Sequence, residues 1–261
     1  MLPEFNVHGK TVLITGASRG IGRNIALVFA EAGADVAVTG LSETNTTNVA
    51  KEICELGRRG VGLVTDATNL SETKALVPKI LESFGHLDIL INCVGDSIPG
   101  LIASLPESNM TVMDETNWHK ILDINLTQAF NTCHAFGPHL LERGNGCVIN
   151  VSGVAGLRAR ANVSAYAAAK AGLIRFTEST ALEWAPYGVR VNAIAPGSFP
   201  DPVQYSKSSL QKREKQARET IPLRRLGKLR EVGLLTLYLA SDASSYITGQ
   251  TIAIDGGSTI A

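Results

Sequence analysis

The sequence is poor in aromatic side chains, has no excess of charge of either sign, and contains no apolar run of membrane-spanning length. Aromatic residues make up 5% of the 261 residues, and 24 Lys and Arg balance 24 Asp and Glu. Proteins that bind nucleic acids or anionic membrane surfaces usually carry a basic excess, so the balance argues against both partners. A membrane-spanning helix needs roughly 20 apolar residues, and no stretch approaches that length. The first ten residues lack the pattern of a secretion signal, which predicts a cytoplasmic protein.

Cysteine is also scarce and shows no ligand spacing. The four cysteines stand apart, with neither Cys-x-x-Cys nor Cys/His motifs, at Cys54, Cys93, Cys133 and Cys147. Isolated thiols of this kind indicate buried cysteines in a reducing compartment, and they predict neither disulfides nor a metal site. His119, His134 and His139 are interpreted as helix-surface or interface groups.

Apolar, β-branched runs alternate with segments of helical periodicity along the whole chain. The runs are Thr11–Thr15, Val36–Thr39, Val61–Thr65, Leu87–Val94, Cys147–Val151, Val189–Ala195 and Thr251–Ile254. Because they are apolar nearly throughout, they are typical of strands that are covered on both faces. After the first run, apolar residues recur at helical spacing from Ile21 to Ala32, and Gly33 ends the helix. The alternation predicts an α/β fold, a doubly wound, Rossmann-like parallel sheet with helices on both faces, in a single domain over residues 1–261.

Two stretches interrupt this rhythm. They are Asp96–Asn117 and Ser198–Gly227, the second rich in Lys, Arg, Ser and Pro. Long irregular segments in a compact domain are often binding loops or lids. Residues 198–227 are therefore the expected substrate loop.

The first apolar run leads into a glycine-rich turn and then a helix. Its sequence is Thr15-Gly16-Ala17-Ser18-Arg19-Gly20-Ile21-Gly22, with GxxxGxG spacing in place of the common GxGxxG. Glycines let a pyrophosphate approach the backbone N–H groups at a helix N-terminus, where the helix dipole favours negative charge. An ordinary strand-to-helix turn is the alternative interpretation.

The residues around the second run bear on the choice of dinucleotide. Asp35 precedes that run and is interpreted as a solvated residue at its start, whereas Gly40 stands at its end, where a carboxylate would bind a ribose 2′-hydroxyl. Nothing there repels a 2′-phosphate, and Arg19 beside the turn can pair with one. NADP is therefore preferred as the cofactor, with NAD as the alternative and a surface role for Arg19 as the competing explanation.

Tyr166 and Lys170 occupy positions i and i+4 of an alanine-rich segment and so share one helix face. An ammonium group about 4 Å from a phenolate stabilises it by on the order of 4 kcal/mol before desolvation is counted. Such a pair can act in general acid–base catalysis, although an isolated YxxxK is usually ordinary helix surface.

Taken together, these motifs resemble those of the short-chain dehydrogenase/reductase family, in particular its 3-oxoacyl-carrier-protein reductase-like members. The resemblance extends over essentially the whole chain. Beyond the glycine-rich turn and the Tyr–Lys pair, it is carried by Asp66-Ala67, Asn92-Cys93-Val94-Gly95, Asn125, Pro196-Gly197 and the final segment Tyr246–Gly257.

The resemblance implies a seven-stranded sheet and hydride transfer between a nicotinamide and a carbonyl or secondary alcohol. Tyr166 would donate the proton, Lys170 would lower the pKa of Tyr166 and hold the nicotinamide ribose, and Asn125 would anchor a water relay or, alternatively, only bend its helix. A homotetramer is implied as well. The implied cofactor-binding residues are Gly16, Ser18, Arg19, Gly20, Ile21, Gly22, Asp66, Ala67, Asn92, Val94, Gly95, Tyr166, Lys170, Pro196 and Gly197.

The sequence departs from the family pattern at the catalytic serine. Thirteen residues before Tyr166 stands Gly153, and the nearest serine is Ser152. Either the strand end bulges and turns Ser152 inward, which is the favoured interpretation, or Tyr166 polarises the carbonyl with another donor.

Further departures concern the substrate side. Asp201 stands where the family has a threonine for the nicotinamide carboxamide, and Asp96–Asn117 is several residues too long. Arg158 and Arg160 could bind an anionic substrate, although solvated surface arginines are more common.

Two functions therefore compete. The first is an NAD(P)-dependent oxidoreductase that interconverts a small-molecule carbonyl and a secondary alcohol, acting on either a 3-oxoacyl thioester or a sugar or polyol. The second is an oligomeric cofactor-binding protein with weak or lost catalysis, because Gly153 lacks the expected hydroxyl.

Overall fold

Seven parallel strands form one sheet in the order β3-β2-β1-β4-β5-β6-β7 in the computed structural model, which describes residues 2–261. The strands are β1 (Thr11–Thr15), β2 (Asp35–Gly40), β3 (Gly60–Val64), β4 (Ile89–Asn92), β5 (Gly146–Val151), β6 (Val189–Pro196) and β7 (Thr251–Ile254). The predicted doubly wound parallel sheet is confirmed. Strand order reverses between β1 and β4, and sheets of this kind bind ligands beyond the carboxyl ends of their strands at that point.

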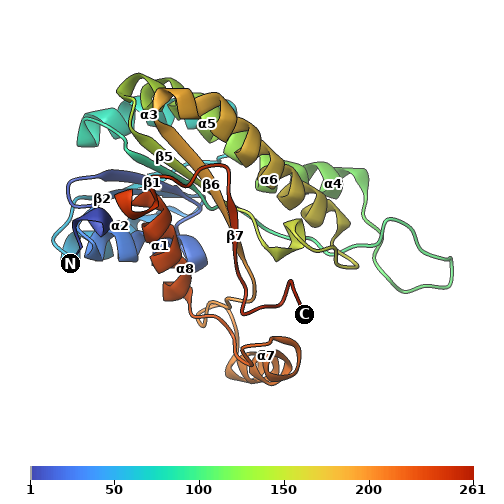
Figure 1. The fold of residues 1–261 in the computed structure, drawn as a ribbon. Helices are drawn as coiled ribbons and strands as arrows, with labels where there is room; N and C mark the ends of the chain where they lie inside the picture. The colour runs from blue at the N-terminus through green and yellow to red at the C-terminus, as the bar shows by residue number, and fades with distance from the viewer. Residues whose placement is uncertain (1) are drawn as a thin grey trace.

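Two groups of helices cover the two faces of the sheet (Figure 1). One group comprises α1 (Gly20–Glu31), α2 (Glu43–Glu55) and α8 (Leu229–Ala240), and the other comprises α3 (Leu70–Phe84), α5 (Gln128–Arg143) and α6 (Ser164–Trp184). Each face has its own apolar core. Within β1, Val12 and Ile14 pack into the core that contains Phe29, while Leu13 packs into the core that contains Phe136. Adjacent side chains of one strand thus serve opposite faces, which explains the continuous apolar runs.

The fourth strand is shorter than its apolar run predicts. The backbone N–H of Cys93 donates to the hydroxyl of Thr15 at 3.2 Å, so the chain leaves the sheet ladder after Asn92. This departure begins the segment that carries Gly95 toward the carboxyl edge of the sheet.

The interpretation of Asp35 as a solvated residue is wrong. Asp35 is only 5% exposed, and its carboxylate accepts hydrogen bonds from Arg58 and Arg59 at 2.7–3.0 Å. Burial acts to raise the pKa of Asp35, but the hydrogen bonds from Arg59 and the charges of both arginines outweigh burial and hold this pKa below its ordinary value. Asp35 therefore anchors the β2–β3 edge.

The cysteines and one histidine also differ in part from expectation. Cys133 and Cys147 are buried and Cys93 is half-buried, but Cys54 is exposed on α2. His139 accepts a hydrogen bond from the backbone N–H of Leu87 at 3.0 Å, so it joins α5 to the start of β4 and is not a free surface group.

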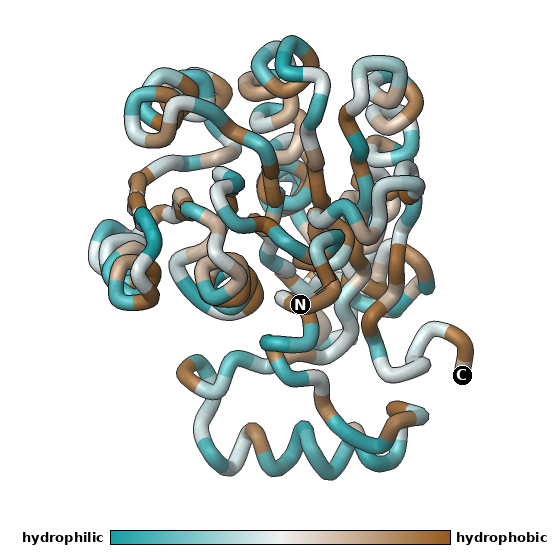
Figure 2. Tube along the Cα trace, turned by 60° about the vertical axis from the view of Figure 1, so that its left-hand side comes forward, coloured by the Kyte–Doolittle hydropathy of each residue, from teal (hydrophilic) through white to brown (hydrophobic). Residues whose placement is uncertain are grey.

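Two segments project from the body of the molecule (Figure 1), and the second of them lies below the body in Figure 2. Residues 100–113 form an arm ahead of α4 (Glu115–Leu122), and its base is closed by bridges between Gly100 and Val163 and between Leu101 and Val112. The second projection is α7 (Lys207–Thr220), which is largely hydrophilic and buries only Ala217. The expectation of an irregular segment is thus wrong for residues 207–220, which form a helix. Its sequence did not indicate a helix because charged and polar residues occupy nearly every position, so no apolar stripe is visible. Within residues 2–261, no helix has the length and apolarity needed to cross a membrane.

Candidate active site

A cavity of about 380 Å³ lies at the carboxyl ends of the strands, beside the reversal in strand order. It brings together most of the residues predicted from separate motifs: Gly16, Arg19, Gly20, Ile21, Gly22, Gly95, Ser152, Tyr166, Lys170, Pro196 and Gly197. The other predicted residues lie outside its lining: Ser18, Asp66, Ala67, Asn92, Val94 and Asn125. The sheet therefore assembles the turn and the Tyr–Lys pair into one site.

The glycines of the turn are required by close backbone approach. Gly16 has φ +64°, and a Cβ atom on it would lie 2.9 Å from Cα of Val94. A Cβ atom on Gly22 would lie 2.5 Å from the carbonyl oxygen of Gly16. Any larger residue at either position would force the turn open, so the turn packs directly on the segment after β4.

The N-terminus of α1 already holds an anionic oxygen. Arg19 occupies the N-cap position and supplies no side-chain cap, so the first N–H groups of the helix need acceptors from elsewhere. The N–H of Gly20 donates to Oδ2 of Asp201 at 3.0 Å, across 181 residues of sequence. The turn thus has the donor geometry that a phosphate oxygen requires, and its residues fit a dinucleotide.

Tyr166 and Lys170 both face this cavity from α6. The ammonium nitrogen of Lys170 lies 5.7 Å from the centroid of the Tyr166 ring and donates to the carbonyl oxygen of Val151 at 2.9 Å. Lys170 is 2% exposed. A Cβ atom on Gly95 would lie 3.0 Å from the Lys170 ammonium, so only glycine leaves this group open to the cavity.

The pKa values differ from the expected pattern. Burial lowers the pKa of Lys170 to about 8, with Cys93 acting in the opposite direction. Burial raises the pKa of Tyr166, and the negative charge of Asp96 raises it further. The net shift of the Tyr166 pKa is therefore upward, and its causes are burial and Asp96. The lowering of this pKa by Lys170 stays a prediction. Tyr166 is held in its protonated form at neutral pH.

Asn125 lies behind the cavity in a π-helical turn, Asp123–Thr127, between α4 and α5. Its side-chain amide donates to the carbonyl oxygens of Asp96 at 2.7 Å and of Ile121 at 2.9 Å, and its Oδ1 accepts from the N–H of Asp96 at 3.3 Å. Asn125 both stabilises this turn and fixes the backbone of Asp96 at the cavity wall.

Comparison with known proteins places this geometry in a family. Residues 16–259 match the family model described as enoyl-(acyl carrier protein) reductase. The 3-oxoacyl-[acyl-carrier-protein] reductase of Thermotoga maritima is 37% identical over 258 residues, 97% of this chain and 99% of the relative, and that of Vibrio cholerae is 37% identical over 252 residues, 97% and 98% respectively. The chain belongs to the short-chain dehydrogenase/reductase family. It is an NAD(P)-dependent oxidoreductase that acts on CH–OH groups.

Solved structures of other short-chain dehydrogenases/reductases superpose closely. One from Mycobacterium marinum has a TM-score of 0.87 at 33% identity and covers 100% of this chain and 99% of its own. A gluconate 5-dehydrogenase from Burkholderia cenocepacia, in complex with NADP and tartrate, has a TM-score of 0.89 at 29% identity, with 99% and 98% coverage. The fold of the family is therefore retained over the full described chain.

The short-chain dehydrogenase/reductase pattern fails at the serine position, and Ser152 does not replace it. The hydroxyl of Ser152 donates to the carbonyl oxygen of Lys170 at 3.0 Å, and Ser152 is 3% exposed. The favoured interpretation, that a bulge turns Ser152 toward the substrate, is wrong. β5 stays regular through Val151, so the side chain of Ser152 points toward α6.

Asn92 supports the sheet and leaves no side-chain atom for a cofactor. It is fully buried, donates to Oδ1 of Asn150 at 2.8 Å and accepts from the hydroxyl of Thr132 at 2.6 Å. Asn150 in turn donates to Thr177 at 2.9 Å. This buried chain of polar groups ties β4 and β5 to α5 and to α6, the helix that carries Tyr166 and Lys170.

Several residues of the cavity wall were not predicted individually: Cys93, Asp96, Ser97, Val151, Phe199, Pro200, Gln204 and Tyr205. Six of them lie in the stretches Asp96–Asn117 and Ser198–Gly227, which the sequence marked as binding loops or lids, whereas Cys93 and Val151 belong to predicted apolar runs. Arg158 and Arg160 are exposed and lie outside the cavity lining, and Arg158 donates to the carbonyl oxygen of Ser258 at 3.0 Å. Arg158 thus holds the C-terminal segment in place.

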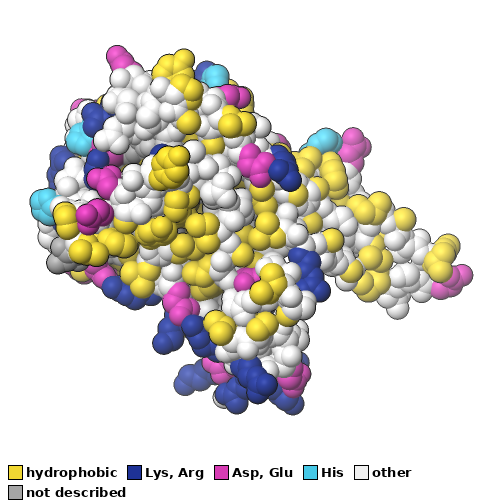
Figure 3. All heavy atoms as spheres, viewed as in Figure 1, with side chains coloured by type: hydrophobic (Ala, Val, Ile, Leu, Met, Phe, Trp, Pro, Cys, Tyr) yellow, Lys and Arg dark blue, Asp and Glu magenta, His cyan; other side chains and the backbone are white. Residues whose placement is uncertain are grey.

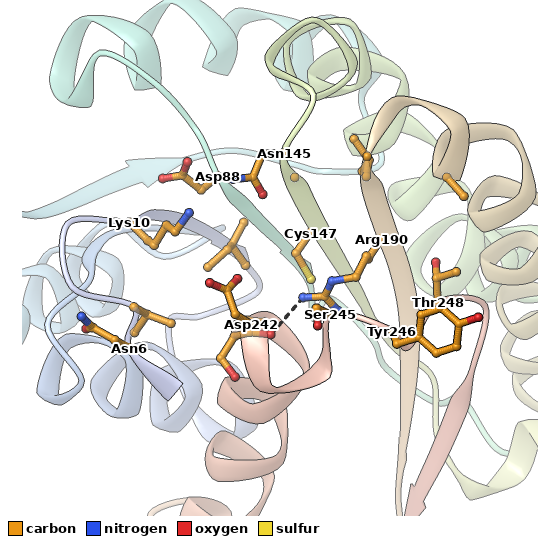
Figure 4. A pocket seen from close by; sticks show the side chains of 18 residues that line it. Asn6, Lys10, Asp88, Asn145, Cys147, Arg190, Asp242, Ser245, Tyr246 and Thr248 are labelled. Carbon is orange, nitrogen blue, oxygen red and sulfur yellow. Dashed lines mark hydrogen bonds between the residues drawn. The ribbon is translucent and has the colours of Figure 1, made fainter. Parts of the chain in front are cut away.

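A larger cavity, about 610 Å³, lies at the opposite, amino ends of the strands (Figure 4). Two of its charged side chains, Arg190 and Asp88, already have partners. Arg190 donates to the carbonyl oxygens of Leu239 and Ser241, and Asp88 accepts from the backbone of Thr11 and from Arg143. These contacts join strand starts to neighbouring helices, so we assign the chemistry to the smaller cavity.

Proposed function

We propose that this chain reduces a carbonyl to a secondary alcohol with NADPH, and that Tyr166 donates the proton. The observation that carries the proposal is the meeting of Tyr166, Lys170 and the glycine-rich turn in one cavity. Burial and Asp96 raise the pKa of Tyr166, so its phenol is protonated at neutral pH, as a proton donor in reduction has to be.

The cofactor, when bound, supplies the hydride. Gly16, Gly20, Ile21 and Gly22 would hold its phosphates, and Lys170 would hold the nicotinamide ribose beside Tyr166. After the proton leaves Tyr166, the ammonium of Lys170 stabilises the phenolate until solvent restores the proton. Asn125 holds Asp96 in place at the wall of the same cavity.

NADPH is favoured over NADH by the residues at the end of β2. A Cβ atom on Gly40 would lie 2.9 Å from Cβ of Ser18, so no carboxylate for a ribose 2′-hydroxyl fits there. Arg19 is exposed and forms no ion pair with any residue of the described chain. Its guanidinium is therefore available to a 2′-phosphate.

A 3-oxoacyl thioester is the substrate class that we favour. The curated relatives named above reduce 3-oxoacyl groups on a carrier protein and match nearly the full chain. The arm that follows the cavity-wall residues Asp96 and Ser97 also exposes apolar side chains: Ile102 is 63% exposed and Leu105 is 74% exposed, and Figure 3 shows hydrophobic atoms along this projection. Such a surface suits an acyl chain better than a polyol. A sugar acid is the second candidate, supported by the gluconate 5-dehydrogenase structure.

The test is a direct assay of the purified protein. NADPH consumption is followed with a 3-oxoacyl thioester and, separately, with a keto sugar acid, and Tyr166→Phe is measured alongside. We expect turnover of the thioester and a loss of about 10² or more in the variant, the scale of general acid catalysis. Retention of over half the activity in Tyr166→Phe would contradict the role of this residue. Binding of NADPH without turnover of any carbonyl would favour a cofactor-binding protein instead.

We also propose a homotetramer, as the family resemblance implies. Light scattering at micromolar concentration tests it, and a monomer would contradict it.

A further inference from the structure

The segment that follows β6 closes over the cofactor turn through one carboxylate. Oδ2 of Asp201 accepts from the N–H of Gly20 at 3.0 Å and from the side-chain amide of Gln204 at 3.2 Å. Oδ1 of Asp201 accepts from the N–H of Val203 at 3.1 Å. Both carboxylate oxygens of Asp201 therefore accept hydrogen bonds. One of them, Oδ2, is bound at the N-terminus of α1, where the proposed function places the cofactor phosphates.

A pyrophosphate and this carboxylate need the same donor. The helix dipole and the orphan N–H of Gly20 attract one anionic oxygen, and two anions at that place repel each other. Asp201 lines the cavity together with Gly16, Gly20 and Gly22, so its charge lies within the volume that the cofactor would enter. Binding of a dinucleotide then requires Asp201 to leave Gly20.

The surroundings give the displaced segment room and counter-charge. Pro200 and Asp201 also line a second cavity, of about 710 Å³, on the side of α7 and the start of α8. That cavity contains Arg218 and Arg224, neither of which forms an ion pair with a residue between positions 2 and 261. Figure 3 shows the concentration of basic side chains around α7. A carboxylate that leaves the turn on this side moves toward positive charge.

We propose that Asp201 is an intramolecular latch that competes with the cofactor pyrophosphate for the N–H of Gly20, so that cofactor binding and opening of residues 198–206 are coupled. The proposal rests on the cofactor site of the proposed function. It assigns to Asp201 a role opposite to that of the threonine which the family resemblance places there: Asp201 weakens dinucleotide binding.

Equilibrium titration with two ligands tests the latch without any substrate. NADPH carries the whole dinucleotide, and ADP-ribose carries the pyrophosphate without nicotinamide. The variants are Asp201→Asn, which removes the charge at constant size, and Asp201→Glu, which keeps the charge. Asp242→Asn is the matched control, because Asp242 is exposed at the amino ends of the strands (Figure 4).

We expect Asp201→Asn to bind both ligands about tenfold or more tightly than the unmodified protein, the effect of removing one like charge from the site. Asp201→Glu and Asp242→Asn should bind them as the unmodified protein does. Hydrogen exchange should show faster exchange in residues 198–206 when NADPH saturates the unmodified protein. Asp201→Ser serves as the neutral variant if Asp201→Asn does not fold.

Equal or weaker binding by the neutral variants would overturn the latch, and so would a gain confined to NADPH, because the pyrophosphate would then not be the competing group. Failure of all forms to bind either ligand would overturn both the latch and the cofactor site. If the neutral variants bind both ligands more tightly but the protein reduces no carbonyl, the latch is supported and only the proposed reaction is contradicted.

Discussion

The hydroxyl oxygen of Tyr166 lies 3.2 Å from the point where a Cβ atom on Gly153 would stand. Gly153 therefore faces Tyr166, the proposed proton donor. The position at which the family resemblance places a serine lies beside Tyr166 but carries no hydroxyl. Gly153 has φ +156° and ψ 159°, a conformation that L side chains rarely adopt. The backbone has adapted to glycine here.

Replacing Gly153 separates the backbone effect from the hydroxyl effect. Gly153→Ala and Gly153→Ser add the same Cβ atom, so both should lose about 1–3 kcal/mol of stability to backbone strain. Only the serine adds a donor at the carbonyl. We expect Gly153→Ser to turn over faster than Gly153→Ala by up to about 10²–10³, the scale of one such hydrogen bond. Steady-state rates and urea unfolding measure both effects, and equal rates in the two variants would show that a hydroxyl at this position does not reach the substrate.

Ser152→Ala should behave as a packing variant. The buried hydroxyl of Ser152 donates to the carbonyl of Lys170, so its loss should lower the free energy of unfolding by about 1–2 kcal/mol. Although Ser152 lines the cavity, turnover should stay within about threefold of the unmodified protein, because its hydroxyl donates to the carbonyl oxygen of Lys170. Loss of most activity in a folded variant would restore Ser152 as the catalytic serine.

The sequence predicted those parts of the molecule that depend on short spacing. Tyr166 and Lys170 are one helical turn apart, and the glycine-rich turn is continuous, so each could be recognised locally. The seven apolar runs likewise correspond to the seven strands, because burial on both faces marks a parallel strand in its own composition.

Contacts between distant segments could not be predicted in this way. The bond from Gly20 to Asp201 joins residues 181 positions apart, and the pairing of Asp35 with Arg58 and Arg59 depends on how β2 and β3 align. The direction of the Ser152 side chain follows from the regularity of β5. The sequence alone did not decide whether β5 stays regular, because Gly153 in the next position also permits a bulge. The pKa of Tyr166 also depends on burial and on Asp96, and neither is visible in an i,i+4 spacing.

Arg19→Ala should weaken the preference for NADPH. Arg19 is exposed beside the turn, so its guanidinium can pair with a 2′-phosphate that NADH lacks. We expect the unmodified protein to bind NADPH more tightly than NADH, and the variant to narrow the difference by about 1–3 kcal/mol. Arg175→Ala is the control, because Arg175 is 81% exposed on α6 and does not line the cavity. Tighter binding of NADH by the unmodified protein would reject the cofactor preference.

Lys170 should make stability depend on pH in the alkaline range. Its pKa is about 8 in the folded protein against 10.5 for the unperturbed side chain. Between these pH values the unfolded chain holds a proton that the folded protein has released, so the free energy of unfolding rises with pH. Lys170→Met lacks this group. The stability of the unmodified protein relative to Lys170→Met should therefore increase by up to about 1 kcal/mol per pH unit across this window.

Urea unfolding of both proteins at several pH values between 8 and 10.5 measures this difference. Cys93 lies beside Lys170, and burial raises its pKa to about 12, so its thiol stays neutral in the folded protein across the window. Cys93 is present in both proteins, and its own titration in the unfolded chain therefore cancels when one curve is subtracted from the other. If the difference in free energy of unfolding between the two proteins stays constant with pH, the folded protein keeps Lys170 protonated throughout this range. The surroundings of Lys170 would then stabilise its ammonium more than its burial and its hydrogen bond to Val151 imply.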